Sequence, residues 1–132
     1  MLVVKTKLGL SSKRGIGLFA GQDISKGAVV GVNKDDLGII HYTEKEWENL
    51  ERHLGTESFN NIKRFAYKNK GDGLYWLNLD DTRFINHSED PNIATVGDND
   101  IAIKDIKIGE EILIDYTTFY EPGYFQEIMQ LS

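Results

Sequence analysis

Nine short runs of β-forming residues, each bounded by turn-forming residues, are the feature that most constrains the fold of this chain. Each run is four to six residues long, which is the usual length of a strand and short for a helix. Turns such as SSKRG, DISKG, NKGDG and KIGE separate them. The runs are residues 2–6, 17–20, 28–32, 38–42, 64–68, 74–79, 92–96, 100–104 and 111–116. We therefore expect a mostly β protein made of several short sheets.

The pattern after Thr43 predicts one amphipathic helix among these strands. Thr43 can cap the helix, and Glu46 stands three residues later, where it completes a capping box. Gly55 is expected to stop the helix, and the tail segment EPGYFQEIMQ predicts a short second one. The apolar face of the first helix consists of Trp47, Leu50 and Leu54.

The length and composition of the chain favour one compact domain over residues 1–132. Its 132 residues are 40% hydrophobic, which allows a single modest core. The absence of cysteine excludes disulfides and thiolate zinc sites. No stretch approaches the roughly 18 apolar residues of a membrane span, so we expect a soluble intracellular protein without a membrane partner.

The formal net charge of −6 argues against a domain that depends on phosphate contacts with nucleic acid. An acidic surface suits a basic protein or peptide partner. Ordinary surface carboxylates on a soluble protein explain the same charge equally well, so the charge by itself does not identify a partner.

Two segments of the chain share one turn pattern. Residues 23–30 (DISKGAVV) and 105–112 (DIKIGEEI) both read Asp-Ile-x-x-Gly followed by a β run. Two copies are too few for a solenoid, which needs about three or more repeats. We interpret them as two similar tight corners, with Gly27 and Gly109 at positions that need positive φ.

The segment KRGIGLFA places Gly15 and Gly17 at the start of a predicted strand, where they would let a ligand approach the backbone. A dinucleotide-binding fingerprint is excluded, because a third glycine and a following helix are missing. An ordinary turn remains an alternative interpretation of these glycines.

The segment RFINHSEDPN, residues 83–92, places an arginine, two asparagines, a histidine and a serine between two predicted strands. We expect Asn86, His87 and Ser88 to lie on a loop, where the amide can both donate and accept. A structural histidine is the alternative for His87. No metal site is expected, because the three histidines lack metal-ligand spacing, and no serine has the context of a hydrolase nucleophile.

The segment GEEILIDY predicts a strand that ends on Tyr116, whose hydroxyl could face a site. Phe119, Tyr120, Tyr124 and Phe125 follow, and an aromatic edge of the core explains them as well. Adjacent strand residues point to opposite faces. We therefore expect Glu110 and Glu111 to be turn and surface charges rather than a catalytic pair.

Together, RGIGLFA, DISKG, RFINHSEDPN and DIKIGEEILIDY resemble the SET-domain family of protein-lysine methyltransferases, in this order and over residues 3–120. The chain resembles the compact SET proteins of viruses and bacteria more than the large chromatin enzymes. The resemblance implies a β-clip type fold with one or two short helices and a C-terminal pseudoknot. In that pseudoknot the segment matching residues 83–88 passes beneath the following strand, and residues 117–132 form an aromatic tail that replaces the family's cysteine-rich zinc segment.

The resemblance also implies an activity: transfer of a methyl group from S-adenosyl-L-methionine to a lysine side chain of a protein substrate. By the match, Tyr116 is the catalytic tyrosine and the backbone of Arg14, Gly15 and Ile16 contacts the methionine part of the cofactor. The remaining matched residues are Gly17 for close approach, Asn86 for the amino-acid end, and His87 for the adenine through its main chain. Among the aromatic residues, Tyr67 is the candidate for one wall of the lysine channel, and Phe119 or Tyr120 for a lid over cofactor and substrate, with Tyr67 and Tyr120 expected to bind the substrate.

Several alternatives remain open from the sequence. The chain could be a SET-like binding module without catalysis, or a small β-rich structural protein. Within the enzyme class the substrate could be a histone or another protein, with a partner or a homodimer completing the site. The compartment could be cytoplasmic, or nuclear in a eukaryotic host.

Overall fold

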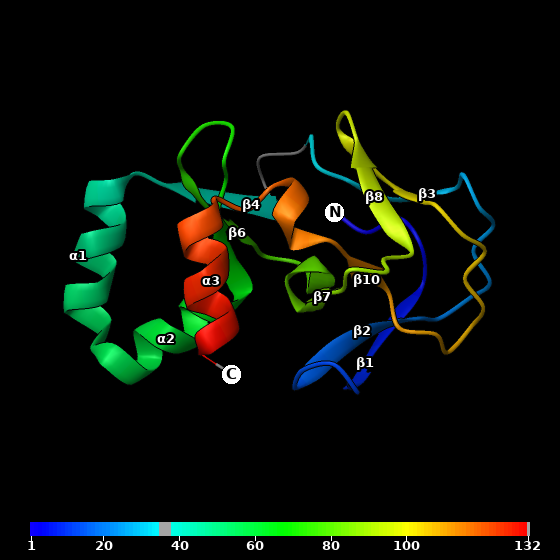
Figure 1. Cartoon of the computed structure of the whole chain (residues 1–132), viewed down its shortest axis with the longest axis horizontal. Coiled ribbons are helices and arrows are strands. Elements are labelled where there is room, and N and C mark those ends of the chain that lie inside the picture. The colour runs from blue at the N-terminus through cyan, green and yellow to red at the C-terminus, as the bar shows by residue number, and fades with distance from the viewer. Residues whose placement is uncertain (35–37, 132) are drawn as a thin grey trace. The chain divides into compact units, whose positions relative to one another are not determined.

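The computed structural model describes residues 1–34 and 38–131 (Figure 1). Contacts between Cα atoms divide the chain into two compact units. The first unit contains Met1–Gly38 and Leu79–Asp115, and the second contains Ile39–Asn78 and Tyr116–Ser132. Most elements are short strands in small sheets, as predicted, and the expectation of a single domain over residues 1–132 stays a prediction.

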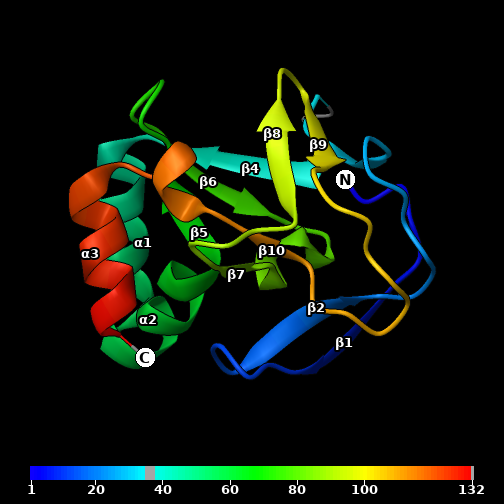
Figure 2. The same cartoon turned by 45° about the vertical axis from the view of Figure 1, so that its right-hand side comes forward.

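The first unit is built from three small sheets (Figure 2). The first sheet is an antiparallel pair in which Leu10 lies opposite Ile16, and the second has the strand order β3-β9-β8. The third is a parallel pair, β7 and β10, in which Asn86 lies opposite Leu113. The strands are β1 (Thr6–Leu10), β2 (Ile16–Ala20), β3 (Val29–Val32), β7 (Asn86–His87), β8 (Ile93–Val96), β9 (Asn99–Ala102) and β10 (Leu113–Ile114).

The parallel strands β7 and β10 lie in the part of the chain where the crossing was predicted. β7 and β10 are separated in sequence by the hairpin of β8 and β9, yet they are hydrogen-bonded neighbours. The segment leading into β10 is also hydrogen-bonded to β2. The Ile112 amide donates to the Leu18 carbonyl at 2.8 Å. Ile112 and Leu18 are fully buried, so this segment runs through the core of the first unit.

The two Asp-Ile-x-x-Gly corners pair with each other. Ile24 and Ile106 exchange two backbone hydrogen bonds of 2.7 and 2.8 Å. The Asp23 carboxylate accepts from the Ile108 amide, and the Asp105 carboxylate accepts from the Lys26 amide. The glycines of both corners have positive φ, +90° for Gly27 and +88° for Gly109, which confirms the predicted conformation. The repeated motif is therefore a pair of matching corners that hold the first unit together.

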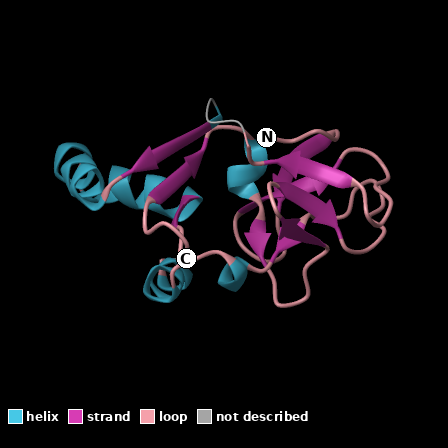
Figure 3. Ribbon diagram, turned by 90° about the horizontal axis from the view of Figure 1, so that it is seen from above, coloured by secondary structure: helices cyan, strands magenta, loops and turns pink. Residues whose placement is uncertain are grey.

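The second unit contains one antiparallel sheet and three helices (Figure 3). The sheet has the order β4-β6-β5, with Tyr42 opposite Tyr75 and Tyr67 opposite Trp76. The strands are β4 (Ile39–Tyr42), β5 (Ala66–Lys68) and β6 (Tyr75–Asn78), and the helices are α1 (Glu44–Leu54), α2 (Thr56–Phe65) and α3 (Pro122–Gln130).

Helices α1 and α3 confirm the two helix predictions, and α2 was missed. Thr43 and Glu46 form the predicted capping box of α1, while the Glu121 carboxylate caps α3. Gly55 ends α1 with a φ of +75°, as expected. Its carbonyl also accepts from the Phe59 amide, which starts α2 at once. The glycine is thus a junction between two helices.

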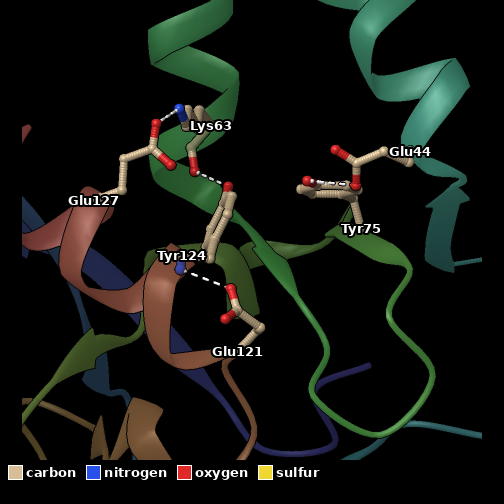
Figure 4. A network of polar contacts seen from close by, with 6 residues as sticks. All are labelled: Glu44, Lys63, Tyr75, Glu121, Tyr124 and Glu127. Carbon is tan, nitrogen blue, oxygen red and sulfur yellow. Dashed lines mark hydrogen bonds and ion pairs between the residues drawn. The ribbon is translucent and has the colours of Figure 1, made fainter.

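A network of polar contacts ties the helices of the second unit together (Figure 4). The buried Tyr124 hydroxyl donates to the Lys63 carbonyl at 2.7 Å, and Lys63 forms an ion pair with Glu127. Tyr75 donates to the Glu44 carboxylate at 2.9 Å. Burial raises the pKa of Tyr124 and of Tyr75, so both phenols stay protonated and act as donors.

Three strand predictions need correction. Residues 2–6 form only an isolated bridge at Leu2, and the regular strand β1 begins at Thr6. In the run 64–68, the first two residues belong to α2 and only Ala66–Lys68 is a strand. The run 111–116 narrows to the strand Leu113–Ile114, and the side chain of Asn92 bonds to the Glu111 carbonyl and the Leu113 amide beside it.

Candidate active site

Asn86 is the centre of the candidate site in the first unit. Its side chain is buried, and its amide nitrogen donates to the carbonyls of Arg14 at 3.0 Å and Ile16 at 3.1 Å. Gly15 lies between these two carbonyls with a φ of +49°, and a Cβ at this position would meet no atom within 4 Å. Four residues named by the sequence analysis therefore meet at the start of β2, and the backbone beside Gly15 is open.

Glu111 is a residue of this cluster whose role the sequence analysis got wrong. Its carboxylate is half-buried and accepts from the Asn86 amide at 3.1 Å and from the Ser11 hydroxyl at 2.8 Å. It is not a surface charge. Glu110 is exposed and accepts from the Lys107 amide at 3.2 Å, which is the predicted turn role. The alternation of faces along a strand already separated the two glutamates and could have identified the inward one.

Gly17 lies directly against this carboxylate. A Cβ on Gly17 would be 2.4 Å from Glu111 Oε2 and 3.0 Å from Ser11 Cβ, far inside van der Waals contact. The residue is buried in β2. A side chain at this position would displace the Glu111 carboxylate, so glycine leaves room for it, independently of any ligand.

The segment after Asn86 is held by hydrogen bonds to β10. It was expected to be a loop, but Asn86 and His87 form the short strand β7, and the Ser88 amide donates to the Ile114 carbonyl at 3.0 Å. The His87 Nδ1 atom lies 3.7 Å from Asp115 Oδ1. The Asn92 side chain donates to the Glu111 carbonyl and accepts from the Leu113 amide, both at 2.8 Å.

The remaining predicted site residues form an aromatic cluster in the second unit, which we define as Tyr67, Tyr116, Phe119 and Tyr120. Tyr116 does not end a strand, because it begins the 3₁₀ turn Tyr116–Thr118. Its ring stacks on Tyr120 with centroids 4.3 Å apart. Tyr67 stacks on the same Tyr120 ring at 5.3 Å and meets the edge of Phe119 at 4.9 Å.

Backbone hydrogen bonds attach the aromatic cluster to the end of β5. The Lys70 amide donates to the Phe119 carbonyl at 3.0 Å, and the Glu121 amide donates to the Lys68 carbonyl at 2.8 Å. Burial, followed by the neighbouring Tyr116, raises the pKa of Tyr120 well above its ordinary value. Tyr120 is therefore a neutral phenol at physiological pH.

Trp76 extends this cluster, although the sequence analysis did not name it as a site residue. Its ring stacks on Tyr67 with centroids 5.8 Å apart. Its indole nitrogen donates to the Asp72 carboxylate at 3.0 Å, which fixes the ring orientation. The period of two along β6 indicates a strand but gives no sign of this stacking, because the partner comes from β5.

Two absences concern the described residues alone. Within residues 1–34 and 38–131, no group of three or more histidine, aspartate or glutamate side chains is arranged to hold a metal ion. In the same part of the chain, no helix has the length and apolar character needed to cross a membrane.

Comparison with known protein families identifies the family of this chain. The family model for the SET domain matches residues 15–117, which include Gly15, Asn86 and Tyr116. The chain belongs to the SET-domain family. No curated protein matches this SET chain at a significant level.

Solved structures agree with this assignment. Chaetomium thermophilum polycomb repressive complex 2, in an autoinhibited conformation bound to S-adenosylmethionine, contains a chain that is 26% identical, with a TM-score of 0.67. That match covers 96% of the SET chain and 17% of the polycomb chain. The Neurospora SET domain protein DIM-5, a histone lysine methyltransferase, is 26% identical with a TM-score of 0.56, over 87% of the SET chain and 53% of its own length.

Proposed function

We propose that this SET protein transfers a methyl group from S-adenosyl-L-methionine to the side-chain amine of a lysine in a protein substrate. The observation that carries the proposal is the docking of Asn86 on the carbonyls of Arg14 and Ile16, beside the open backbone of Gly15. The family match and two similar proteins support it, one bound to S-adenosylmethionine and one a histone lysine methyltransferase.

The residues of the first unit fit the amino-acid end of this cofactor. That end carries an ammonium group, which requires hydrogen-bond acceptors. The Asn86 amide has a carbonyl oxygen, and the Glu111 carboxylate lies 3.1 Å from the nitrogen of the same amide. The open Gly15 backbone gives a ligand access to main-chain groups. We propose the cofactor-binding residues to be Arg14, Gly15, Ile16, Gly17, Asn86, His87 and Phe119.

When bound, S-adenosylmethionine supplies an electrophilic methyl group on a sulfonium, which leaves as a neutral thioether. The Tyr116 hydroxyl would orient the lysine amine and polarise the methyl donor. Tyr116 is buried and its ring stacks on Tyr120, which holds the ring and its hydroxyl oxygen in place. Preorganised polar groups of this kind are among the largest contributions to catalysis.

The aromatic cluster suits a lysine side chain. The methylene groups of a lysine bury well against Tyr67 and Tyr120, and aromatic faces attract the lysine ammonium group. A lysine must lose its proton before it can attack, because the protonated amine has no lone pair, and desolvation lowers its pKa. Tyr120 is held as a neutral phenol and is no base at neutral pH. We propose solvent as the acceptor of this proton. The net charge of −6 favours a basic substrate segment, in a histone or in another protein.

The test is a methyl-transfer assay with labelled S-adenosylmethionine, core histones and lysine-containing peptides. We expect transfer by the wild type and a loss on the order of 100-fold in kcat for Tyr116→Phe, the effect of losing one preorganised polar group. Tyr42→Phe is the matched control, because Tyr42 lies on β4 against Trp47 and has no proposed role in the site. Undiminished transfer by Tyr116→Phe would reject the assignment of Tyr116. Cofactor binding without transfer to any protein would reject the enzyme in favour of an inactive binding module.

A further inference from the structure

Three side chains form a hydrogen-bonded centre, which we define as Ser11, Asn86 and Glu111. Both oxygens of the Glu111 carboxylate lie 2.8 Å from the Ser11 hydroxyl, and one of them lies 3.1 Å from the Asn86 amide nitrogen. The three residues come from positions up to 100 apart in sequence. The centre therefore joins the turn before β2, the strand β7 and the segment that leads into β10.

The surroundings of the Asn86 amide determine which way it points. Its nitrogen has three neighbours within hydrogen-bonding distance, the carbonyls of Arg14 and Ile16 and the Glu111 carboxylate. All three can only accept, so the nitrogen must face them. The carbonyl oxygen of Asn86 is thereby directed to the opposite side, as an acceptor for a ligand.

Ser11 extends the influence of Glu111 to the turn that contains Gly15. The Ser11 hydroxyl oxygen accepts from the amides of Lys13 at 2.9 Å and Arg14 at 3.2 Å, while its proton serves the Glu111 carboxylate. The Ser11 amide also donates to the Gly15 carbonyl at 2.8 Å. The shape of the open backbone at Gly15 therefore depends on the position of this carboxylate.

The charge of Glu111 has no close cationic counterpart in the structure. Among residues 1–34 and 38–131, no lysine or arginine nitrogen lies within 4.0 Å of its carboxylate. A half-buried carboxylate of this kind is complemented well by a cationic ligand group, because charge interactions strengthen where water is excluded.

From these contacts we infer that Glu111 is a positioning residue that orients the Asn86 amide and supplies the negative charge for the α-ammonium group of the cofactor. The inference rests on the proposed function, because it assigns a part of the same site. It also gives Gly17 a second role, since only glycine leaves room for the carboxylate. Tyr116 and the transfer step are untouched by it.

The test compares the binding of two ligands by calorimetry, S-adenosylhomocysteine and 5′-methylthioadenosine, to the purified full chain. The second ligand lacks the amino-acid end. We expect Glu111→Gln to weaken S-adenosylhomocysteine about tenfold, the usual effect of losing a hydrogen bond to a charged group, while 5′-methylthioadenosine binds as to the wild type. A merely structural role of Glu111 would weaken both ligands alike. The exposed neighbour Glu110→Gln is the control and should bind both ligands normally.

Two further variants keep the inference falsifiable if Glu111→Gln folds poorly. Ser11→Ala removes one partner of the carboxylate and should show the same selective loss, two- to fivefold in size by the lower end of the hydrogen-bond range. Gly17→Ala displaces the carboxylate and should weaken S-adenosylhomocysteine more than 5′-methylthioadenosine. Equal weakening of both ligands, or unchanged binding in these variants, would overturn the inference. Absence of binding to the wild type would overturn the proposed function instead.

Discussion

The two units hold their candidate functional residues by different physical means. In the first unit, Asn86, Asn92 and Glu111 are placed by hydrogen bonds between side chains and main chain across small sheets. In the second unit, Tyr67, Tyr116 and Tyr120 are placed by stacking of rings. Hydrogen bonds fix direction, which suits recognition of a polar ligand end, whereas ring stacking builds a shaped apolar surface. The difference predicts that the site residues of the first unit are disturbed most by loss of hydrogen-bonding groups, and those of the second unit by loss of aromatic rings.

The largest effect on stability is expected from Trp47→Ala in the second unit. Trp47 is buried in α1, stacks on Tyr75 at 4.5 Å and meets the edge of Phe59 at 5.0 Å. Its removal should lower the free energy of unfolding by about 3–5 kcal/mol, as for other large-to-small core changes. Urea unfolding measures this. Trp76→Ala is the matched control, because Trp76 is only half-buried, and an equal loss in both variants would contradict the account.

The corresponding destabilising substitution in the first unit is Asn92→Ala. This change removes the side chain that serves the Glu111 carbonyl and the Leu113 amide, and leaves both main-chain groups without that partner. We expect a loss of about 2–3 kcal/mol, mostly the desolvation of these groups. Asn61→Ala, at an exposed position in α2, should change stability by no more than about 0.5 kcal/mol. A loss below 1 kcal/mol for Asn92→Ala would show that solvent replaces these bonds.

The paired corners of the first unit offer a sharper test, because they should respond alike. Gly27 and Gly109 have φ values of +90° and +88°, and an added Cβ at either position meets no atom within 4 Å. The penalty for alanine is therefore conformational alone, about 1–2 kcal/mol at each corner. Thermal unfolding of Gly27→Ala and Gly109→Ala should show two losses of similar size. A clear difference would mean that the corners are not equivalent.

The smallest effect concerns a buried acid of the first unit, Asp100. Burial raises its pKa above the ordinary value near 3.8, although its carboxylate accepts from Thr95 and Asn33. A raised pKa means that the folded state holds the proton more tightly than the unfolded state. The contribution of Asp100 to stability is therefore present at low pH and is lost as pH rises through the raised pKa.

Asp100→Asn removes this titration, so the stability of the variant relative to the wild type should increase as pH rises from about 3 to 7. Chemical unfolding at several pH values measures the difference. Asp98→Asn, at an exposed position on the same hairpin, is the control and should show a flat difference. A flat difference for Asp100→Asn would mean that burial does not perturb this carboxyl.

Local patterns were predicted well, and contacts distant in sequence were not. The capping box at Thr43 and the positive φ of Gly109 follow from a few neighbouring residues, and both are confirmed. Helix α2 was missed because Gly55 ends one helix and begins the next, and a glycine is read as a stop. The strand expected at 64–68 begins late, because α2 continues through Phe65.

The same contrast holds for the candidate site: its residues were named from the sequence, and most of their contacts were not. The motifs named Asn86, and the expected aromatic channel named Tyr67. The structure places Asn86 against the carbonyls of Arg14 and Ile16, and Tyr67 against the ring of Tyr120. The alternation of strand faces separates Glu111 from Glu110, but the partners of Glu111 lie 25 and 100 residues away, so no local pattern shows what its carboxylate contacts. The stacking of Trp76 on Tyr67 depends likewise on strand register.

The central claim is that the cluster around Asn86 binds the cofactor. The most direct test is a titration of the isotope-labelled chain with S-adenosylhomocysteine, followed through the backbone amide resonances. The account predicts saturable shifts at Gly15, Gly17, Asn86 and His87, with those of α1 unchanged and the Asn86→Ala variant not responding. No shifts at millimolar ligand, or shifts away from these four residues, would contradict it.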